Sequence, residues 1–519
     1  MVTPERPGIR SATITLGCVL LALLVVGVVT AGDYGVSWDE PDNAAFGRQA
    51  LQAYADLRPP AEWQSNLESK GPFFVAAAEA ITATVAALGG GAAETGARHL
   101  AYFLTLPLAA VGLFSLGLRI AHPWPAFSAT MLFIAQPLIY GHAFINPKDT
   151  PFMAFFLASM AMGVWMVESR AELVSKPGSL GLRLGLPVVS GVVLGLTTSI
   201  RVFGPFAGLL ITLFAVLRLK GRGLSFLVPY WIAAAAATYV TWPHLWADPF
   251  LRFWESIQVL TDFPWDNLIL YRGLAYPAVE IPWHYLPFTT VIQLTLPAMI
   301  LAVGGSVVGL IGMAADAARR PMYLVLFLWT AIPYGAALLA RSEIYDNSRQ
   351  FLFAIPPLFL AGALAFDGLF SRIRWRPAQA AIAALAVLPG LVAIVRLHPY
   401  QYIYYNELVG GVPEAYRQYE LDYWATSYRA AMEGLNRLAP PGSTVEVVGP
   451  WLAAATFARP DLAVSKFGTT PAGAPAPDYL IVFTRSNADQ YLNVPGTTVL
   501  QIVTDGAVLS EVRAVGESR

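Results

Sequence analysis

Long apolar stretches alternate with short polar connections along most of the chain. Several of these stretches are close to 20 residues long, the length that crosses the hydrocarbon core of a bilayer. The pattern predicts about eleven membrane spans. They lie near residues 12–30, 100–120, 126–140, 151–167, 184–200, 206–217, 224–241, 289–313, 322–340, 351–370 and 378–395. The pattern therefore predicts an all-α polytopic membrane protein.

The distribution of Lys and Arg predicts the orientation of these spans, because cytoplasmic connections carry an excess of cations. With a cytoplasmic N-terminus, each predicted inside connection carries at least one of them. These cations are Arg119, Arg170, Lys176, Arg183, Arg218, Lys220, Arg222, Arg319, Arg320, Arg372, Arg374 and Arg376. The shorter apolar stretch 73–88 would invert every later connection if it crossed the membrane. We therefore expect it to form a helix that lies on the outer membrane surface or dips into it.

Three longer segments then fall on the outer side. Residues 1–397 form the predicted membrane domain, with a first outer loop at 31–98 and a second outer loop, rich in Trp and Tyr, at 242–288. The aromatic side chains of the second loop form an interfacial belt, stack on sugar rings or line a groove for a polyprenyl chain. The third segment, 398–519, is a predicted extracytoplasmic domain.

The pattern of this third segment changes from long apolar runs to short alternating ones. Residues 442–449 and 477–483 are predicted strands, and 423–438 is a predicted amphipathic helix. Residues 497–503 and 507–512 flank a Thr-Asp-Gly turn and predict a hairpin. The segment is therefore expected to be a small α/β domain.

Composition agrees with a membrane protein and excludes some functions. The chain of 519 residues is 56% hydrophobic and 13% charged, whereas soluble proteins carry about 25% charged residues. A net charge of −1 gives no basic surface for nucleic acid. The single cysteine, Cys18, excludes an intramolecular disulfide.

The charged residues gather at the outer ends of the predicted spans. Asp39 and Glu40 follow the first span directly, in the sequence Ser-Trp-Asp-Glu-Pro. From the residues alone they are either the charged start of a helix, which Pro41 favours, or part of a site. Four further cations lie on the side where the distribution rule predicts few. They are Lys148, Arg201, Arg341 and Arg349.

The acidic pair resembles the motif in the first outer loop of the GT-C glycosyltransferases, such as the protein O-mannosyltransferases and the bacterial lipid A aminoarabinose transferases. Three further elements are similar in order and place. They are residues 68–73 (Glu-Ser-Lys-Gly-Pro-Phe), residues 146–151 (Asn-Pro-Lys-Asp-Thr-Pro) and residues 347–351 (Asn-Ser-Arg-Gln-Phe). The first element has Gly71 where those families usually have a proline. The resemblance covers the membrane part, to about residue 397.

The resemblance implies a GT-C-like fold and transfer of a sugar from a polyprenyl-phosphate donor, with inversion, to a lipid, glycan or protein acceptor. Asp39 would be the general base, and Glu40 would position it. Lys70 and Arg349 would bind the phosphate on which charge builds as the sugar leaves. We also expect the adjacent carboxylate of Glu40 to raise the pKa of Asp39.

Three neighbouring charged residues keep two interpretations each. Lys148 and Asp149 either contact the donor or pair with each other at the surface. Arg201 binds phosphate or extends towards the lipid headgroups. A divalent cation held by the acidic pair and a histidine is a further possibility, although no ligand spacing in the sequence supports it.

Two other classes of function compete with the enzyme. A transporter or flippase for a lipid-linked saccharide would place charges in mid-span, whereas these spans are nearly free of charge. A non-catalytic envelope assembly protein would keep its function when Asp39 is changed. The expected partners are the donor, an acceptor and membrane lipids, and the expected location is a bacterial inner membrane.

Overall fold

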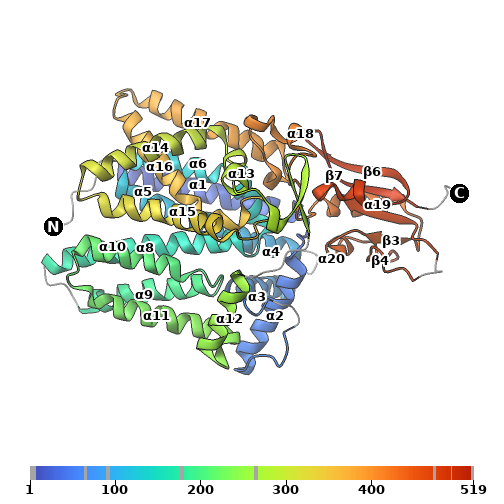
Figure 1. The fold of residues 1–519 in the computed structure, drawn as a ribbon, viewed down its shortest axis with the longest axis horizontal. Coiled ribbons are helices and arrows are strands. Elements are labelled where there is room, and N and C mark those ends of the chain that lie inside the picture. The colour runs from blue at the N-terminus through green and yellow to red at the C-terminus, as the bar shows by residue number, and fades with distance from the viewer. Residues whose placement is uncertain are drawn as a thin grey trace.

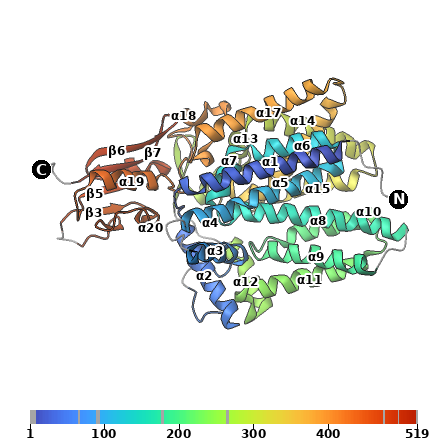
Figure 2. The same ribbon diagram turned by 180° about the vertical axis from the view of Figure 1, so that it is seen from behind.

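The protein is a long helical bundle with a small sheet domain at one end (Figure 1). This computed structural model describes residues 8–63, 67–88, 94–175, 180–261, 267–471, 475–492 and 494–515. The N-terminal helix begins at the far end of the bundle, and the chain ends in the sheet domain (Figures 1 and 2). The predicted fold class, an all-α membrane protein with a small C-terminal α/β domain, is confirmed.

Seven stretches of the described chain are long and apolar enough to cross a membrane. They contain α1 (Ile9–Thr30), α4 with α5 (Glu94–Phe103 and Thr105–Ile120), α8 (Asp149–Ser175), α11 (Leu227–Thr241), α14 (Leu296–Ala315), α15 (Arg320–Ala340) and α17 (Arg376–Arg396). A bent pair, α6 (Pro123–Ile134) and α7 (Pro137–Ile145), passes the same test as one broken span. Three shorter apolar helices, α9 (Leu180–Thr198), α10 (Pro205–Leu219) and α16 (Pro356–Phe370), lie where spans are predicted.

The predicted inside connections lie together. Those between α5 and α6, α10 and α11, α14 and α15, and α16 and α17 are at the end of the bundle where the chain begins, and α8 ends and α9 begins there as well (Figure 1). The C-terminal domain and the first outer loop lie at the opposite end. Of the predicted inside cations, Lys176 lies outside the described residues.

The bend between α6 and α7 has a local cause. Pro137 at the start of α7 cannot donate the hydrogen bond that would continue α6, and the two axes differ by 60°. The side chain of Gln136 donates instead to the carbonyl oxygen of Leu132, at 2.8 Å. It also accepts from the backbone of Thr295 on the neighbouring segment, at 3.0 Å. The bend brings the end of α7 under the first outer loop.

Two helices of the first outer loop cover this end of the bundle. They are α2 (Glu40–Asp56) and α3 (Phe73–Ala87), which pack against each other. Figures 1 and 2 both show α3 end-on, so it runs across the direction of the spanning helices. This orientation agrees with the surface helix predicted for residues 73–88.

The aromatic outer loop has more structure than its sequence indicates. It contains α12 (Pro249–Thr261), strands β1 (Leu268–Tyr271) and β2 (Leu274–Pro277), and the start of α13 (Tyr285–Gln293). The two strands form an antiparallel hairpin, with Arg272 and Gly273 at its tip in the left-handed region. The hairpin is too short for its alternation to stand out among the aromatic residues.

The C-terminal domain is built on a five-stranded sheet with strand order β4-β3-β5-β7-β6. Its strands are β3 (Thr444–Val447), β4 (Ala463–Lys466), β5 (Tyr479–Phe483), β6 (Thr497–Thr504) and β7 (Ala507–Ala514). The first three are parallel to one another, whereas β7 is antiparallel to both β5 and β6. The domain also contains α19 (Tyr428–Leu438), α20 (Trp451–Ala455) and α21 (Ala488–Tyr491). Helix α19 packs against β5, β6 and β7.

Helix α19 begins five residues later than predicted. The carboxylate of Asp422 accepts hydrogen bonds from the backbone N–H groups of Thr426 and Ser427, at 2.9 and 3.1 Å. These bonds hold residues 423–427 in a turn before the helix.

A chain segment of mixed turns links the two parts and belongs to the bundle in its packing. It contains η7 (Gln401–Ile403), η8 (Glu407–Val409) and α18 (Gly411–Ala415). Its aromatic residues, among them Tyr402, Tyr405, Tyr423 and Trp424, are buried in the core of the bundle. A separate core for the sheet domain begins at Ala425.

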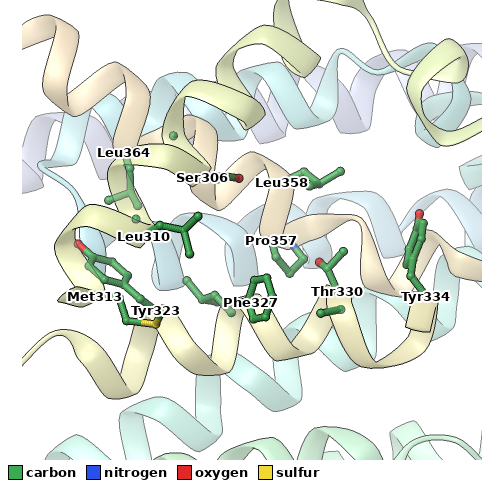
Figure 3. A pocket seen from close by; sticks show the side chains of 15 residues that line it. Ser306, Leu310, Met313, Tyr323, Phe327, Thr330, Tyr334, Pro357, Leu358 and Leu364 are labelled. Carbon is green, nitrogen blue, oxygen red and sulfur yellow. The ribbon is translucent and has the colours of Figure 1, made fainter. Parts of the chain in front are cut away.

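An apolar groove of about 370 Å³ lies between α14, α15 and α16 (Figure 3). Gly305 and Gly309 form part of its wall on α14, and Phe327, Thr330 and Tyr334 line it on α15. Tyr334 and Thr330 also contact η6 (Arg349–Ala354), the short helix that begins with one of the predicted site residues.

Candidate active site

The predicted site residues come from five separate parts of the chain and meet at the end of the bundle that faces the C-terminal domain. They are Asp39 and Glu40 at the start of α2, Lys70 before α3, Lys148 and Asp149 at the start of α8, Arg201 between α9 and α10, and Arg349 at the start of η6.

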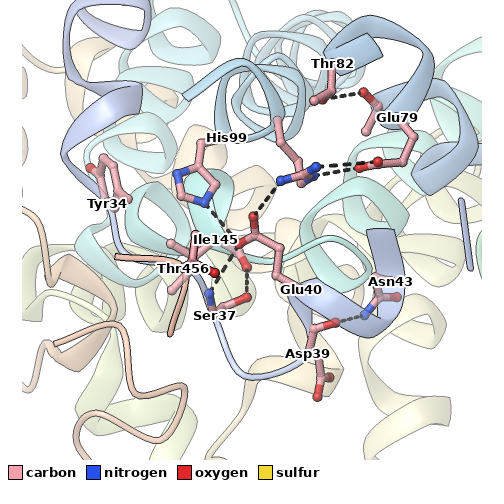
Figure 4. A network of polar contacts seen from close by, with 12 residues as sticks. Tyr34, Ser37, Asp39, Glu40, Asn43, Glu79, Thr82, His99, Ile145 and Thr456 are labelled. Atoms are coloured by element: carbon pink, nitrogen blue, oxygen red, sulfur yellow. Dashed lines mark hydrogen bonds and ion pairs between the residues drawn. The ribbon is translucent and has the colours of Figure 1, made fainter. Parts of the chain in front are cut away.

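The two adjacent acids point in opposite directions (Figure 4). The side chain of Asp39 is 37% exposed, and it pairs with Lys148, whose Nζ lies 3.7 Å from Oδ2. The side chain of Glu40 is 1% exposed. Asp39 is therefore the carboxylate that a bound molecule can reach.

Asp39 occupies the N-cap position of α2 but makes no capping hydrogen bond with its side chain. Burial raises the pKa of Asp39, but the positive charges of Lys148 and Arg349 outweigh burial, so the pKa falls below its ordinary value. The expectation that the neighbouring carboxylate raises this pKa is wrong, because Glu40 points away into a separate set of partners. Asp39 is ionised at neutral pH.

Glu40 belongs to a network, which we call the Glu40 cluster: Glu40, Glu79, Arg98 and His99. Arg48 joins it from the surface, with Nη1 2.9 Å from Glu79 Oε2. His99 Nε2 lies 3.0 Å from Glu40 Oε2, and the Arg98 guanidinium bridges to Glu79 with an Nε–Oε1 distance of 2.6 Å. Burial raises the pKa of Glu40, but His99 and Arg98 outweigh burial and lower it. Glu40 fixes the start of α2 from the side opposite to Asp39.

Gly71 explains how Lys70 reaches the site. A Cβ atom at Gly71 would lie 2.1 Å from the backbone carbonyl group of Ser199, so only glycine permits this approach. Phe73 N–H donates to the same Ser199 carbonyl, at 3.1 Å. The departure from the proline of the resembled families thus brings Lys70 beside the segment that carries Arg201.

The lysines lie close enough to repel each other. Repulsion from Lys148, together with burial, lowers the pKa of Lys70 well below its ordinary value. Burial is the main cause that lowers the pKa of Lys148. Both lysines line a small hollow beside Asn43, whose buried Oδ1 has no hydrogen-bond partner.

Asp149 bridges two arginines and does not pair with its neighbour Lys148. Its carboxylate contacts Arg201, and its Oδ2 accepts from Arg349 Nη1 at 3.1 Å. Asn146 Nδ2 donates to the same oxygen, at 2.9 Å. The surface pairing considered for the two adjacent residues is therefore not what this structure contains.

Arg349 is held on several sides. Its Nε and Nη2 donate to Asp346 Oδ2, at 3.0 and 2.8 Å. Its guanidinium lies 5.0 Å from the ring centre of Trp424 and 5.3 Å from that of Tyr345. Burial lowers the pKa of Arg349, but Asp346 and Asp149 outweigh burial and raise it well above its ordinary value. Arg349 is permanently charged.

A further arginine, Arg485, comes from the C-terminal domain. Its Nη2 lies 2.5 Å from Asp346 Oδ1, and its guanidinium lies 5.2 Å from the ring centre of Trp38. Sequence reasoning did not find Arg485, because a single arginine after a short strand carries no motif. Only the tertiary fold brings it to the outer loop.

These residues form what we call the Asp39 cluster. Its cations are Lys70, Lys148, Arg201, Arg349 and Arg485, and its acids are Asp39, Asp149 and Asp346. Among these eight groups, with all of them ionised, the cations outnumber the acids by two, and two further acids, Asp42 and Glu420, lie at the edge of the cluster. The buried Nε of Arg201 also lacks a hydrogen-bond partner. Such a site favours an anion with several oxygen acceptors, as a phosphate has.

Solved structures share this architecture, although no protein-family model and no curated protein sequence matches the chain. ArnT from Cupriavidus metallidurans in the apo state aligns with a TM-score of 0.55 and 14% sequence identity, over 98% of this chain and 99% of that chain. With ArnT bound to undecaprenyl phosphate, the TM-score is 0.53 and the identity 13%, over the same shares. This chain has the fold of ArnT.

The likeness to ArnT agrees with the fold that the sequence resemblance implies. The oligosaccharyltransferase of Archaeoglobus fulgidus, tethered with an acceptor peptide, aligns with a TM-score of 0.49 and 11% identity, over 89% of this chain and 69% of that chain. The protein is an integral membrane protein, as its apolar helices and the ArnT fold indicate.

The acidic pair and a histidine, considered above as ligands of a divalent cation, do not point towards one common position. Glu40 is bonded to His99 and Ser37, whereas Asp39 faces lysine. Within the described ranges, no group of three or more His, Cys, Asp and Glu side chains gathers at one point. His142, the histidine beneath the cluster, instead contacts the hydroxyl of Tyr423 at 2.8 Å.

Proposed function

We propose that this protein is an inverting glycosyltransferase that moves a sugar from a polyprenyl phosphate to an acceptor on the outer face of a bacterial inner membrane. The observation that carries the proposal is the Asp39 cluster. Five cations gather around the partly exposed carboxylate of Asp39, at the end of a membrane bundle. The ArnT fold supports it, since an ArnT structure contains undecaprenyl phosphate.

In the proposed reaction, the acceptor hydroxyl gives its proton to Asp39 as its oxygen attacks the anomeric carbon of the sugar. The bond from that carbon to the phosphate oxygen breaks, and its electron pair goes to the phosphate. Lys70 and Arg349 stabilise the charge that builds there. Because the attack is a single displacement from the opposite face, the anomeric configuration inverts.

Donor binding also prepares the base. In the empty site, the neighbouring cations lower the pKa of Asp39 and make it a weak proton acceptor. A bound phosphate compensates those cations, so the pKa of Asp39 rises towards that of a useful base. The reaction is thereby favoured only when the donor is present.

The apolar groove offers a place for the first part of the polyprenyl chain. It has a volume of about 370 Å³, lies among the apolar helices α14, α15 and α16, and reaches η6 through Thr330 and Tyr334. Since η6 begins with Arg349, a chain in the groove would lead towards the proposed phosphate site. Burial of the apolar polyprenyl chain in the groove adds affinity for the donor without polar contacts.

Mass spectrometry of envelope lipids, glycans and proteins tests the proposal. Cells that express the wild-type protein should contain one class of molecule with an added sugar mass, and cells that express Asp39→Asn at the same level should lack it. Identical covalent products in both would refute transfer by Asp39. Unchanged products with an altered distribution of lipid-linked saccharide across the membrane would favour the flippase.

A further inference from the structure

The loop that carries Arg485 is held in an unusual backbone conformation. Arg485 begins η9 (Arg485–Asn487), just beyond the carboxyl end of β5, and Ser486 and Asn487 follow with φ angles of 50° and 60°. Two consecutive residues other than glycine in the left-handed region are costly unless their surroundings fix them. Ser486 N–H and Oγ both donate to the Glu420 carboxylate, at 3.2 and 2.7 Å. The loop is therefore built to hold its side chains in one place.

Arg485 is 7% exposed, and it contacts residues on two sides of the Asp39 cluster. On one side its guanidinium lies over Trp38, the residue before Asp39. On the other side it pairs with Asp346, and Nη1 donates to the backbone carbonyl of Tyr423 at 2.9 Å. One side chain of the C-terminal domain thus connects the loop of the base with the partner of Arg349.

Asp346 divides its two oxygens between two arginines. Oδ1 pairs with Arg485, and Oδ2 accepts both hydrogen bonds from Arg349. If Arg485 were absent, the whole charge of this buried carboxylate would act on Arg349. The attraction of Arg349 for an incoming anion would then fall, because electrostatic interactions are strong at buried sites.

We propose that Arg485 is a positioning residue for the donor phosphate. It neutralises part of Asp346, so that Arg349 keeps positive charge for the ligand, and it holds Trp38 beside Asp39. The C-terminal domain is thus required to bind the polyprenyl phosphate, in addition to any role with the acceptor. This inference rests on the proposed function.

Binding of undecaprenyl phosphate to the purified full-length protein in lipid nanodiscs tests the inference. Arg485→Gln keeps hydrogen bonding but removes the charge, and it should weaken binding about tenfold, the size of coupling found between contacting charged groups. Arg485→Lys keeps the charge but cannot contact Asp346, Tyr423 and Trp38 together. It should weaken binding by about threefold.

Arg429→Gln is the matched control for loss of domain contacts. Arg429 also belongs to the C-terminal domain, lies over an aromatic ring, and donates to backbone carbonyls of the first outer loop. Its contacts in the described part of the chain are with Gly32, Tyr34, Glu433 and Phe457, so its variant should bind the lipid as the wild type does.

A double-mutant cycle separates charge from docking. In the Asp346→Asn background, Arg485→Gln should change affinity by less than about twofold, because its partner charge is already gone. An equal loss in both backgrounds would mean that Arg485 only docks the domain, and the inference would be overturned.

The remaining outcomes are also decisive. Wild-type affinity in folded Arg485→Gln overturns the inference alone; if that variant does not fold, wild-type affinity in Arg485→Lys does so. No binding of undecaprenyl phosphate by the wild-type protein overturns the proposed function and the inference with it.

Discussion

Two charged clusters lie on either side of the peptide bond between Asp39 and Glu40, and they differ in charge balance and access. In the Glu40 cluster, both acids are buried against cationic partners, and Glu40 also accepts from Ser37 N–H at 3.2 Å. In the Asp39 cluster, five cations surround three acids, and the central carboxylate is 37% exposed. The first cluster is complete without a ligand, whereas the second has charge left for one.

The difference shows that sequence adjacency does not make two acids equivalent. Two successive side chains at the start of a helix point in different directions, because each residue is rotated by about 100° around the helix axis. Glu40 therefore serves the geometry of α2, and Asp39 serves the open site. If the two acids divide the roles in this way, substitutions in the two clusters have different effects, and the largest loss of turnover is expected at Asp39.

Asp39→Asn should lower turnover by about 10²–10⁴-fold, the usual contribution of a general base. The amide keeps the size of the side chain but cannot take the acceptor proton. Undecaprenyl phosphate affinity should change much less, because the base acts on the acceptor. Transfer rate and lipid affinity on purified, folded protein are the measurements. Near-normal turnover would mean that Asp39 is only the charged start of a helix.

Glu40→Gln should mainly affect stability. Removing one partner from a buried ion pair leaves the others unbalanced and costs about 3 kcal/mol of the free energy of unfolding. Turnover of the folded protein should fall by less than for Asp39→Asn. Thermal inactivation of detergent-purified protein measures the loss, with Glu433→Gln, whose ion pair with Arg429 is more exposed, as the control. A larger loss of turnover than in Asp39→Asn would reverse the two roles.

Lys70→Ala should weaken binding of undecaprenyl phosphate by about tenfold while the protein stays folded, since one charge-assisted contact is lost. Lys466→Ala is the control. Lys466 is exposed on strand β4 and has no described contact with the Asp39 cluster, so this variant loses the same charge but should bind undecaprenyl phosphate normally. Equal affinity in both variants would exclude Lys70 from the phosphate site.

Donor affinity should also fall as pH rises. In the empty site, repulsion from Lys148 and burial keep the pKa of Lys70 low, and a bound phosphate raises it. Binding is then strongest below the pKa that Lys70 has in the empty site. It weakens as the pH rises towards the higher pKa that Lys70 has when the phosphate is bound. Above about pH 7.5 the phosphate itself is fully ionised, so a further decline comes from the protein. Lys70→Arg should flatten it, and an unchanged slope in that variant would assign the effect to another group.

The sequence predicts the membrane fold well, because long apolar runs and the distribution of cations are local signals. It also predicts which ends of the spans meet, so Lys70, Asp149 and Arg349 are found from motifs far apart in the chain. It does not predict the contacts among them. Asp149 pairs with Arg349, and not with its neighbour Lys148, because α8 and η6 pack together.

The position of Arg485 and the contacts of the Glu40 cluster could not be predicted from the sequence. Arg485 depends on how the C-terminal domain docks, and His99 meets Glu40 only because α4 begins beneath the first outer loop. The hairpin β1–β2 was missed for a related reason. Its strands are four residues each, and they are fixed by partners elsewhere, such as Glu420, which accepts from Leu270 N–H at 2.7 Å.

The buried linker between the two domains has a consequence for how such proteins can diversify. Tyr402, Tyr405 and Trp424 fill the core of the bundle, so a recombination junction placed at the end of α17 would remove part of that core. A junction near Ala425, where the second core begins, would leave it intact. Even there, a replacement domain must bring its own arginine to Asp346. If Arg485 has the proposed role, the sheet domain can vary across most of its surface, but the η9 loop that carries Arg485 must be kept together with the membrane part.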